Sequence, residues 1–210
     1  MSDCPRCGAP LATPLACGAC GALLEVEGAP SPFGVFGLEP TYDVDAGALR
    51  RKLLELARLV HPDYFATAGE TTRGRAERAS ALLHQAFEIL SDELARADWL
   101  ITALGGPREG ELRDMPQAFL LEVLEWNEAL VEARTEGATD AARARLQALA
   151  SDLTSARREA LQRLRSRLSP LPALGSDALR EARRELNALR YLQRTLEQIE
   201  ALRLEQAASR

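Results

Sequence analysis

The sequence lacks any apolar segment long enough to cross a bilayer, and its start does not resemble a leader. Among its 210 residues, no apolar stretch approaches the roughly 20 residues that a membrane-spanning helix needs. The first residues, Met1 to Pro5, carry neither the basic n-region nor the apolar h-region of a secretory signal. We therefore expect a protein that makes no membrane contact and works in the cytoplasm.

Aromatic residues, β-branched residues and excess positive charge are also scarce. The chain has only five Phe, two Trp and three Tyr, and Leu, Ala, Arg and Glu dominate from Ala46 onward. These four are good helix formers, and no useful alternating apolar/polar run appears, so we predict an all-α body. The formal net charge of -5 argues against a nucleic-acid partner, because neutralising phosphates requires clustered Lys and Arg.

Catalytic signatures are missing as well. The chain has two histidines and contains no G-x-S-x-G, phosphate-loop or H-E-x-x-H motif. We therefore predict that the protein is not an enzyme.

Composition divides the chain into three predicted domains. Residues 1–30 hold all four cysteines, and the Pro-rich residues 29–32 read as a linker. Residues 33–106 form a helical domain that ends at a Gly-Gly-Pro sequence, and residues 112–210 form a second helical domain.

Helix patterns follow the same division. Asp45 is a good N-cap for a helix over 46–60, which Pro62 ends. A second helix is predicted over about 75–90, either continuing or restarting after Asp92. Three more are predicted over about 116–135, 139–168 and 176–207. Their short connections favour an antiparallel three-helix bundle, with a long hairpin coiled coil as the alternative.

The cysteines form two C-x-x-C-G units, which contain Cys4, Cys7, Cys17 and Cys20. Each unit makes a tight knuckle that presents two thiolates, and two knuckles complete the four-sulfur set of a structural zinc ion. The alternatives are a pair of disulfides or a redox C-x-x-C motif. Disulfides fit poorly with a cytoplasmic chain, and no strand–helix pattern surrounds either unit. We predict one structural zinc.

The tripeptide His61-Pro62-Asp63 follows the first long helix. The core stripe of that helix is Leu49, Leu53, Leu56 and Val60. At about 100° per residue, Arg50, Arg51 and Arg58 lie with His61 on the opposite side. A basic face therefore leads up to the turn. The plainer interpretation is a helix stop with an incidental histidine and a solvated charged face.

The helix over 116–135 has more apolar surface than one packed face requires. Phe119 begins its core stripe, whereas Leu120, Leu124 and Leu121 lie about 100°, 140° and 200° away from Phe119. On the last helix, Tyr191 lies about 200° from Leu189, opposite the core stripe. We expect the side chains of Leu120, Leu121, Leu124 and Tyr191 to form an exposed interface. Self-association or burial against the preceding domain are the alternatives.

These residues carry a resemblance to a known family. Helices flanking His-Pro-Asp resemble a J-domain, and further motifs resemble the HscB family of J-proteins that serve iron–sulfur cluster assembly. The matching segments are F-G-V-F-G-L from Phe33, A-S-A-L-L-H-Q-A-F from Ala79, R-A-D-W-L-I from Arg96, A-F-L-L-E-V-L-E from Ala118 and L-R-Y-L from Leu189. Together they span about residues 33–202. Some members also carry an N-terminal two-knuckle cysteine segment.

The resemblance implies an adaptor between two proteins. A DnaK/HscA-type chaperone ATPase would dock on the J-domain, and an IscU-type iron–sulfur scaffold would dock on the C-terminal domain. The implied chaperone contacts are His61, Pro62, Asp63, Arg50, Arg51 and Arg58. The implied client contacts are Leu120, Leu121, Leu124 and Tyr191, with Glu125 and Glu128 as a polar rim. Asn127 departs from a basic residue seen in some members.

Two other functions fit parts of the pattern. One is a generic J-protein with another client, which the apolar Leu/Tyr surface argues against. The other is a zinc-ribbon adaptor with a helical tail, which the acidic charge and the scarcity of aromatics disfavour when nucleic acid is the partner.

Overall fold

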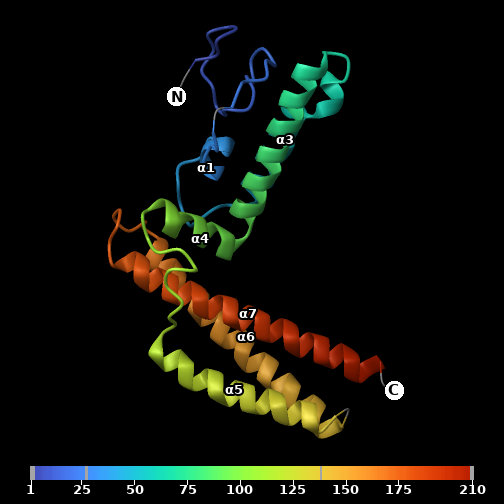
Figure 1. Ribbon diagram of the computed structural model, residues 1–210, viewed down its shortest axis with the longest axis vertical. Coiled ribbons are helices and arrows are strands. Elements are labelled where there is room, and N and C mark those ends of the chain that lie inside the picture. Colours follow the sequence, from blue (N-terminus) through green and yellow to red (C-terminus); the bar gives the residue numbers. More distant parts are fainter. Residues whose placement is uncertain (1–2, 27, 138, 209–210) are drawn as a thin grey trace. The chain divides into compact units, whose positions relative to one another are not determined.

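The computed structural model describes residues 3–26, 28–137 and 139–208 (Figure 1). Within these ranges the regular elements are helices, and the β-type pairings are two isolated bridges. The helices are α1 (Pro32–Phe36), α2 (Ala46–Val60), the 3-10 turn η1 (Pro62–Phe65), α3 (Glu70–Ser91), α4 (Glu93–Ala103), α5 (Gln117–Thr135), α6 (Asp140–Leu168) and α7 (Ala178–Ala208). The all-α prediction is confirmed. In the described part of the chain, no helix combines the length and apolarity that a bilayer crossing demands.

The chain folds as two compact units, one ending at Trp99 and the other beginning at Leu100. The first contains the cysteine segment together with α1, α2 and α3, and the second contains α5, α6 and α7. The finer division into three domains stays a prediction.

A helical hairpin of α2 and α3 dominates the first unit. The carboxylate of Asp45 accepts the backbone N–H of Ala48 at 2.8 Å, which caps α2 and lowers the pKa of that carboxyl. The predicted bounds of α2 are confirmed. The predicted start of α3 near residue 75 was wrong, because the helix begins at Glu70, directly after Gly69 with φ 86°. Gly74 lies inside this helix, and the cost of about 1 kcal/mol that a glycine brings does not break it.

The core of the first unit forms where α1 packs against α3. Phe33 is fully buried, and the centroid of its ring lies 5.4 Å from that of Trp99, the last residue of the first unit. Helix α4 is a restart, because the Asp92 carboxylate accepts the N–H groups of Leu94 and Ala95. Arg96 is buried and donates to the carbonyl of Tyr42 at 2.8 Å, and its burial lowers its pKa.

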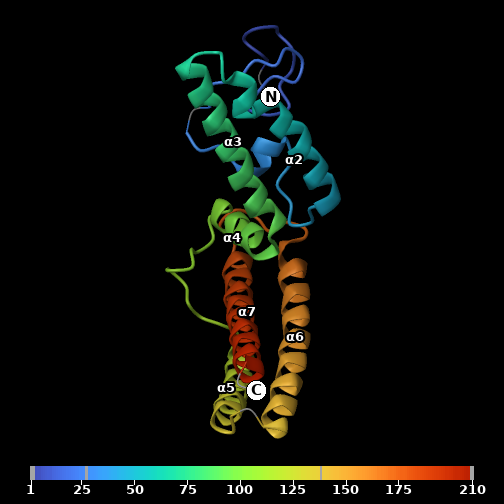
Figure 2. The same ribbon diagram turned by 90° about the vertical axis from the view of Figure 1, so that its right-hand side faces the viewer.

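The second unit is an antiparallel bundle in which α6 and α7 lie side by side and α5 packs beside them (Figure 2). This confirms the three-helix bundle over the long hairpin. The Thr139 hydroxyl caps α6 by accepting the N–H of Ala142 at 3.1 Å. Buried leucines fill the space between the helices, namely Leu146, Leu153, Leu164, Leu168, Leu179, Leu186, Leu189 and Leu192. The buried carboxylate of Glu185 lies 3.1 Å from Arg163 and 3.7 Å from Arg167, so its charge is compensated.

Candidate functional site

Two matching knuckles build the cysteine cluster. In the first, the N–H of Cys4 donates to the carbonyl of Ala9, and the N–H of Gly8 donates to the carbonyl of Cys4, both at 2.8 Å. The second knuckle repeats both bonds, with Cys17 and Gly21 as donors at 2.9 Å. Gly8 and Gly21 have φ values of 73° and 68°, which a residue with a Cβ rarely adopts. The C-x-x-C-G spacing therefore sets the loop shape.

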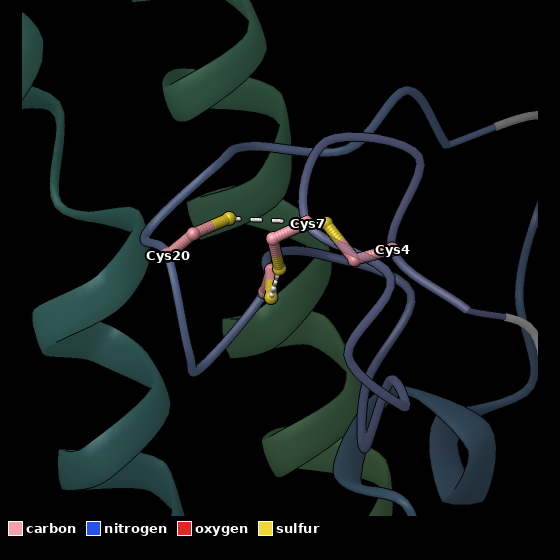
Figure 3. A group of neighbouring side chains, drawn as sticks. Cys4, Cys7 and Cys20 are labelled. Atoms are coloured by element: carbon pink, nitrogen blue, oxygen red, sulfur yellow. Dashed lines mark hydrogen bonds between the residues drawn. The ribbon is translucent and has the colours of Figure 1, made fainter.

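The thiol groups of Cys4, Cys7 and Cys20 point towards one another (Figure 3), and the thiol of Cys17 belongs to the same cluster. The Sγ atoms of Cys4 and Cys20 are 3.8 Å apart, those of Cys7 and Cys17 are 3.7 Å apart, and all four lie within 4.8 Å of one another. Sulfurs placed about 2.3 Å from a tetrahedral ion are about 3.8 Å apart. The cluster therefore fits a single metal ion held by four thiolates.

The thiols of this cluster titrate unequally. The N–H of Ala9 lowers the pKa of Cys7, but the other three thiols and desolvation outweigh it and raise that pKa to about 12. The N–H groups of Cys20 and Ala19 lower the pKa of Cys17 to about 7. Protons therefore compete with a metal cation for the sulfurs, and acid weakens metal binding.

The cysteine segment packs tightly against α1. The Thr13 hydroxyl donates to the carbonyl of Val35 at 2.8 Å, and the side chain of Leu15 is fully buried. A Cβ on Gly37 would come within 2.2 Å of the carbonyl oxygen of Ala12, so only glycine fits there. The metal-binding segment is thus physically joined to the helical part of the first unit.

Metal loss should destabilise the first unit without removing its helices. With Cys4→Ser and Cys17→Ser combined, we expect no bound metal and a lower unfolding temperature, because the loops that bury Leu15 are no longer fixed. The far-ultraviolet circular dichroism at low temperature should change little, since every described helix begins after the cysteine segment. Elemental analysis and thermal unfolding, with chelator-treated wild type as control, test this. Metal retained by the variant, or an unchanged unfolding temperature, would contradict it.

The His61-Pro62-Asp63 turn is exposed at the junction of α2 and η1. The N–H of Asp63 donates to Nδ1 of His61 at 3.3 Å, and a carboxylate oxygen of Asp63 lies 3.7 Å from the same nitrogen. The ring of His61 meets that of Tyr64 edge-on, with 5.9 Å between centroids. Because Nδ1 accepts the N–H of Asp63, the hydrogen of the neutral ring is on Nε2. Tyr64 is 70% exposed and was not singled out from the sequence.

The predicted basic face of α2 lies on the surface. Arg50, Arg51 and Arg58 are all exposed, whereas Leu49 and Leu56 are buried on the other side of the helix. The helix phase is confirmed, and the role of the arginines in docking stays a prediction.

The apolar excess on α5 is exposed as predicted. Leu120, Leu121 and Leu124 have 45%, 68% and 62% of their surface exposed. Glu125 and Glu128 beside them are also exposed. Val131 has 59% of its surface exposed and extends this surface. The sequence contained the signal for Val131, because seven residues after Leu124 bring the helix round to nearly the same direction. We call Leu120, Leu121, Leu124 and Val131 the α5 face.

The prediction for Tyr191 needs correction. Its ring is half-buried and meets the ring of Phe119 at 90°, with 5.8 Å between centroids. Its hydroxyl accepts a hydrogen bond from the side-chain amide of Asn127 at 2.9 Å. Tyr191 points away from the leucine stripe of α7, as predicted, but α5 covers that side. It is therefore part of the packing between α5 and α7 as well as a neighbour of the exposed surface.

Comparison with known proteins gives consistent matches. Residues 115–200 match the family described as HSCB C-terminal oligomerisation domain. The chain is 38% identical over 128 residues to the co-chaperone protein HscB homolog of Bordetella petrii, covering 60% of this chain and 72% of that protein. It is 37% identical over 101 residues to the homolog of Shewanella halifaxensis, covering 48% and 58%.

Solved structures agree. The crystal structure of human co-chaperone protein HscB matches with a TM-score of 0.75 and 25% identity, covering 97% of this chain and 99% of that one. The chaperone HscB from Vibrio cholerae has the same fold, with a TM-score of 0.69, 24% identity and coverage of 84% and 99%.

The fold and these matches define the class of protein as a co-chaperone. The chain belongs to the HscB family, so the resemblance noted in the sequence is confirmed. It carries in addition a four-cysteine cluster able to hold a metal ion.

Proposed function

We propose that this protein is a cytoplasmic adaptor that stimulates the ATPase of a DnaK/HscA-type chaperone and delivers an IscU-type scaffold to it for iron–sulfur cluster assembly. It would do so without bond chemistry of its own. One observation carries the proposal: two exposed surfaces of different chemistry lie on separate compact units. The first is the His61-Pro62-Asp63 turn with its basic helix, and the second is the α5 face.

The chaperone contact would begin with electrostatics. Arg50, Arg51 and Arg58 present positive charge along α2, which steers encounter with an acidic surface more than it supplies affinity. The exposed ring of His61 at the end of that helix would then engage the partner. Binding energy spent there would bias the ATPase towards hydrolysis, as in any allosteric coupling between two sites.

The client contact would be mainly apolar. The α5 face offers four exposed aliphatic side chains, and exposed apolar groups that gather on one surface mark interfaces. Glu125 and Glu128 would give it an acidic rim, so the fitting client has an apolar patch bordered by lysine or arginine.

Zinc is the ion that we propose for the cysteine cluster. Four thiolates at tetrahedral spacing fill all its coordination positions, which is the arrangement of a structural rather than a catalytic site. The ion would fold residues 1–30 against the J-domain, residues 33–106, while residues 112–210 would form the client domain.

A second copy of the chain is the competing occupant of the α5 face, because the matching family is described as an oligomerisation domain. In a two-fold symmetric dimer built on α5, the same surface is used twice, so the acidic rims would face each other. Glu125 and Glu128 of one copy would then repel the same acidic pair of the other copy wherever the two rims meet. This charge pattern favours a different, basic partner.

A pull-down tests the proposal. Tagged wild-type protein should recover both a purified DnaK-type ATPase and a purified IscU-type scaffold, and a variant lacking Cys4 and Cys17 controls for loss of the metal segment. Recovery of neither partner, with a dimer seen by sedimentation velocity, would overturn the proposal in favour of self-association.

A further inference from the structure

A hollow of about 510 Å³ lies beside Tyr191 on the second unit. The loop that precedes α5 forms one wall, and one side of α7 forms the other. Its lining includes Glu109, Arg113, Met115, Arg190, Tyr191 and Arg194. Three guanidinium groups thus meet one carboxylate, which makes the hollow positive in a chain whose net charge is -5.

Part of this positive charge is free to bind another group. Glu109 forms a close ion pair with Arg190, and it reaches Arg194 only at 3.8 Å. The Arg194 side chain is 70% exposed, so that second ion pair is weak. Arg113 is exposed and takes part in no ion pair within the described ranges. With one carboxylate against three guanidinium groups, the hollow therefore keeps a net positive charge.

The hollow is formed before any partner arrives. The side-chain amide of Asn187 donates to the carbonyls of Leu112 and Asp114, each at 2.9 Å. The buried Arg183 donates from Nε to the carbonyl of Pro107 at 2.8 Å. These bonds fasten the loop backbone to α7, so the ordering that remains to be lost when a ligand binds is mainly that of the exposed arginine side chains.

Tyr191 joins the hollow to the α5 face. Its ring lines the hollow, meets Phe119 of α5 edge-on, and accepts a hydrogen bond from Asn127 of the same helix. Tyr191 therefore contacts both the hollow and α5.

We infer that the client-binding surface continues past Tyr191 into this hollow, where Arg113 and Arg194 receive an acidic side chain of the client. The inference rests on the proposed function of the α5 face. Guanidinium groups bind carboxylates through paired hydrogen bonds, and the hollow is also lined by Met115 and Tyr191, whose apolar surface strengthens such bonds by excluding water. The client would then carry basic groups opposite Glu125 and Glu128 and an acidic group opposite the arginines. Such a pattern selects both the partner and its orientation.

Charge reversal at Arg194 tests the inference. Calorimetric titration of Arg194→Glu with an IscU-type scaffold should give a Kd at least about fivefold above wild type, the upper range for an exposed ion pair with added repulsion. The matched control is Arg203→Glu, on the same helix and also paired with a glutamate, which should bind like wild type. Arg113→Glu should reproduce the loss, and it provides a second variant if Arg194→Glu unfolds.

The outcomes separate this inference from the proposed function. If wild type binds the scaffold and both hollow variants bind equally well, the inference is overturned while the proposed function stands. If wild type does not bind the scaffold, both are overturned. Sodium phosphate should weaken wild-type binding more than sodium chloride of equal ionic strength does, because phosphate competes with a carboxylate for guanidinium groups. Arg194→Glu should lose that difference, and equal weakening of wild-type binding by the two salts would contradict the inference.

Discussion

His61→Gln should abolish stimulation of the chaperone ATPase and leave scaffold binding unchanged. Glutamine lacks the ring that meets Tyr64, and it also lacks the Nδ1 atom that accepts the hydrogen bond from the Asp63 N–H. Allosteric couplings of 1–3 kcal/mol correspond to about 5- to 150-fold, and stimulation of that order should disappear. The side chain is 52% exposed, so stability should change by less than about 0.5 kcal/mol. Single-turnover ATP hydrolysis measures the effect.

The matched control is the other histidine. His84 is also exposed, and its ring lies 2.8 Å from the carbonyl oxygen of Ser80 in its own helix, with no other hydrogen bond among the described residues. His84→Gln should therefore stimulate like wild type. Normal stimulation by His61→Gln would mean that the turn is only a helix stop.

Leu124→Ala should weaken scaffold binding at least tenfold while melting near wild type. A tenfold loss corresponds to about 1.4 kcal/mol, which is modest for an anchor at the centre of an interface. Because the leucine is 62% exposed, its truncation leaves no cavity. Leu204→Ala is the matched control, since Leu204 is 63% exposed on α7, outside the α5 face, and should affect neither property.

Phe119→Ala should instead lose thermal stability before it loses scaffold binding. Its ring is buried between those of Trp126 and Tyr191, and deleting a buried Phe typically costs about 3–5 kcal/mol. Stability should therefore fall first. Tyr191→Ala should lose both stability and binding, because it packs on Phe119 and borders the exposed surface. Thermal unfolding paired with calorimetric titration distinguishes the variants. If Leu124→Ala unfolds like Phe119→Ala, the α5 face is not the client surface.

Local chemistry explains what the sequence predicted well. Asp45 and Thr139 cap their helices, and Pro62 ends α2, so these boundaries follow from a few neighbouring residues. The cysteine cluster was equally predictable, because the spacing within each knuckle sets the loop shape and the matching pair completes the set of four sulfurs. Patterns of this kind need no knowledge of distant parts of the chain.

Contacts between distant segments explain what the sequence did not predict. Counting angles on α7 placed Tyr191 correctly on that helix, but it could not reveal that α5 covers that side. The packing of Leu15 and the approach of Ala12 to Gly37 likewise join segments with no shared pattern. The arginine hollow combines a loop with one side of α7, and neither element alone indicates it.

The most direct test of the adaptor proposal is single-turnover ATP hydrolysis by a DnaK/HscA-type chaperone, measured with this protein, with an IscU-type scaffold, and with both together. The proposal predicts that both together accelerate hydrolysis by more than the product of their separate effects. Leu124→Ala should lose only the part of the acceleration that depends on the scaffold, and His61→Gln should lose all of the acceleration that this protein causes. Full acceleration by Leu124→Ala with scaffold present, or no cooperation between wild type and scaffold, would contradict the claim that one chain joins the two partners.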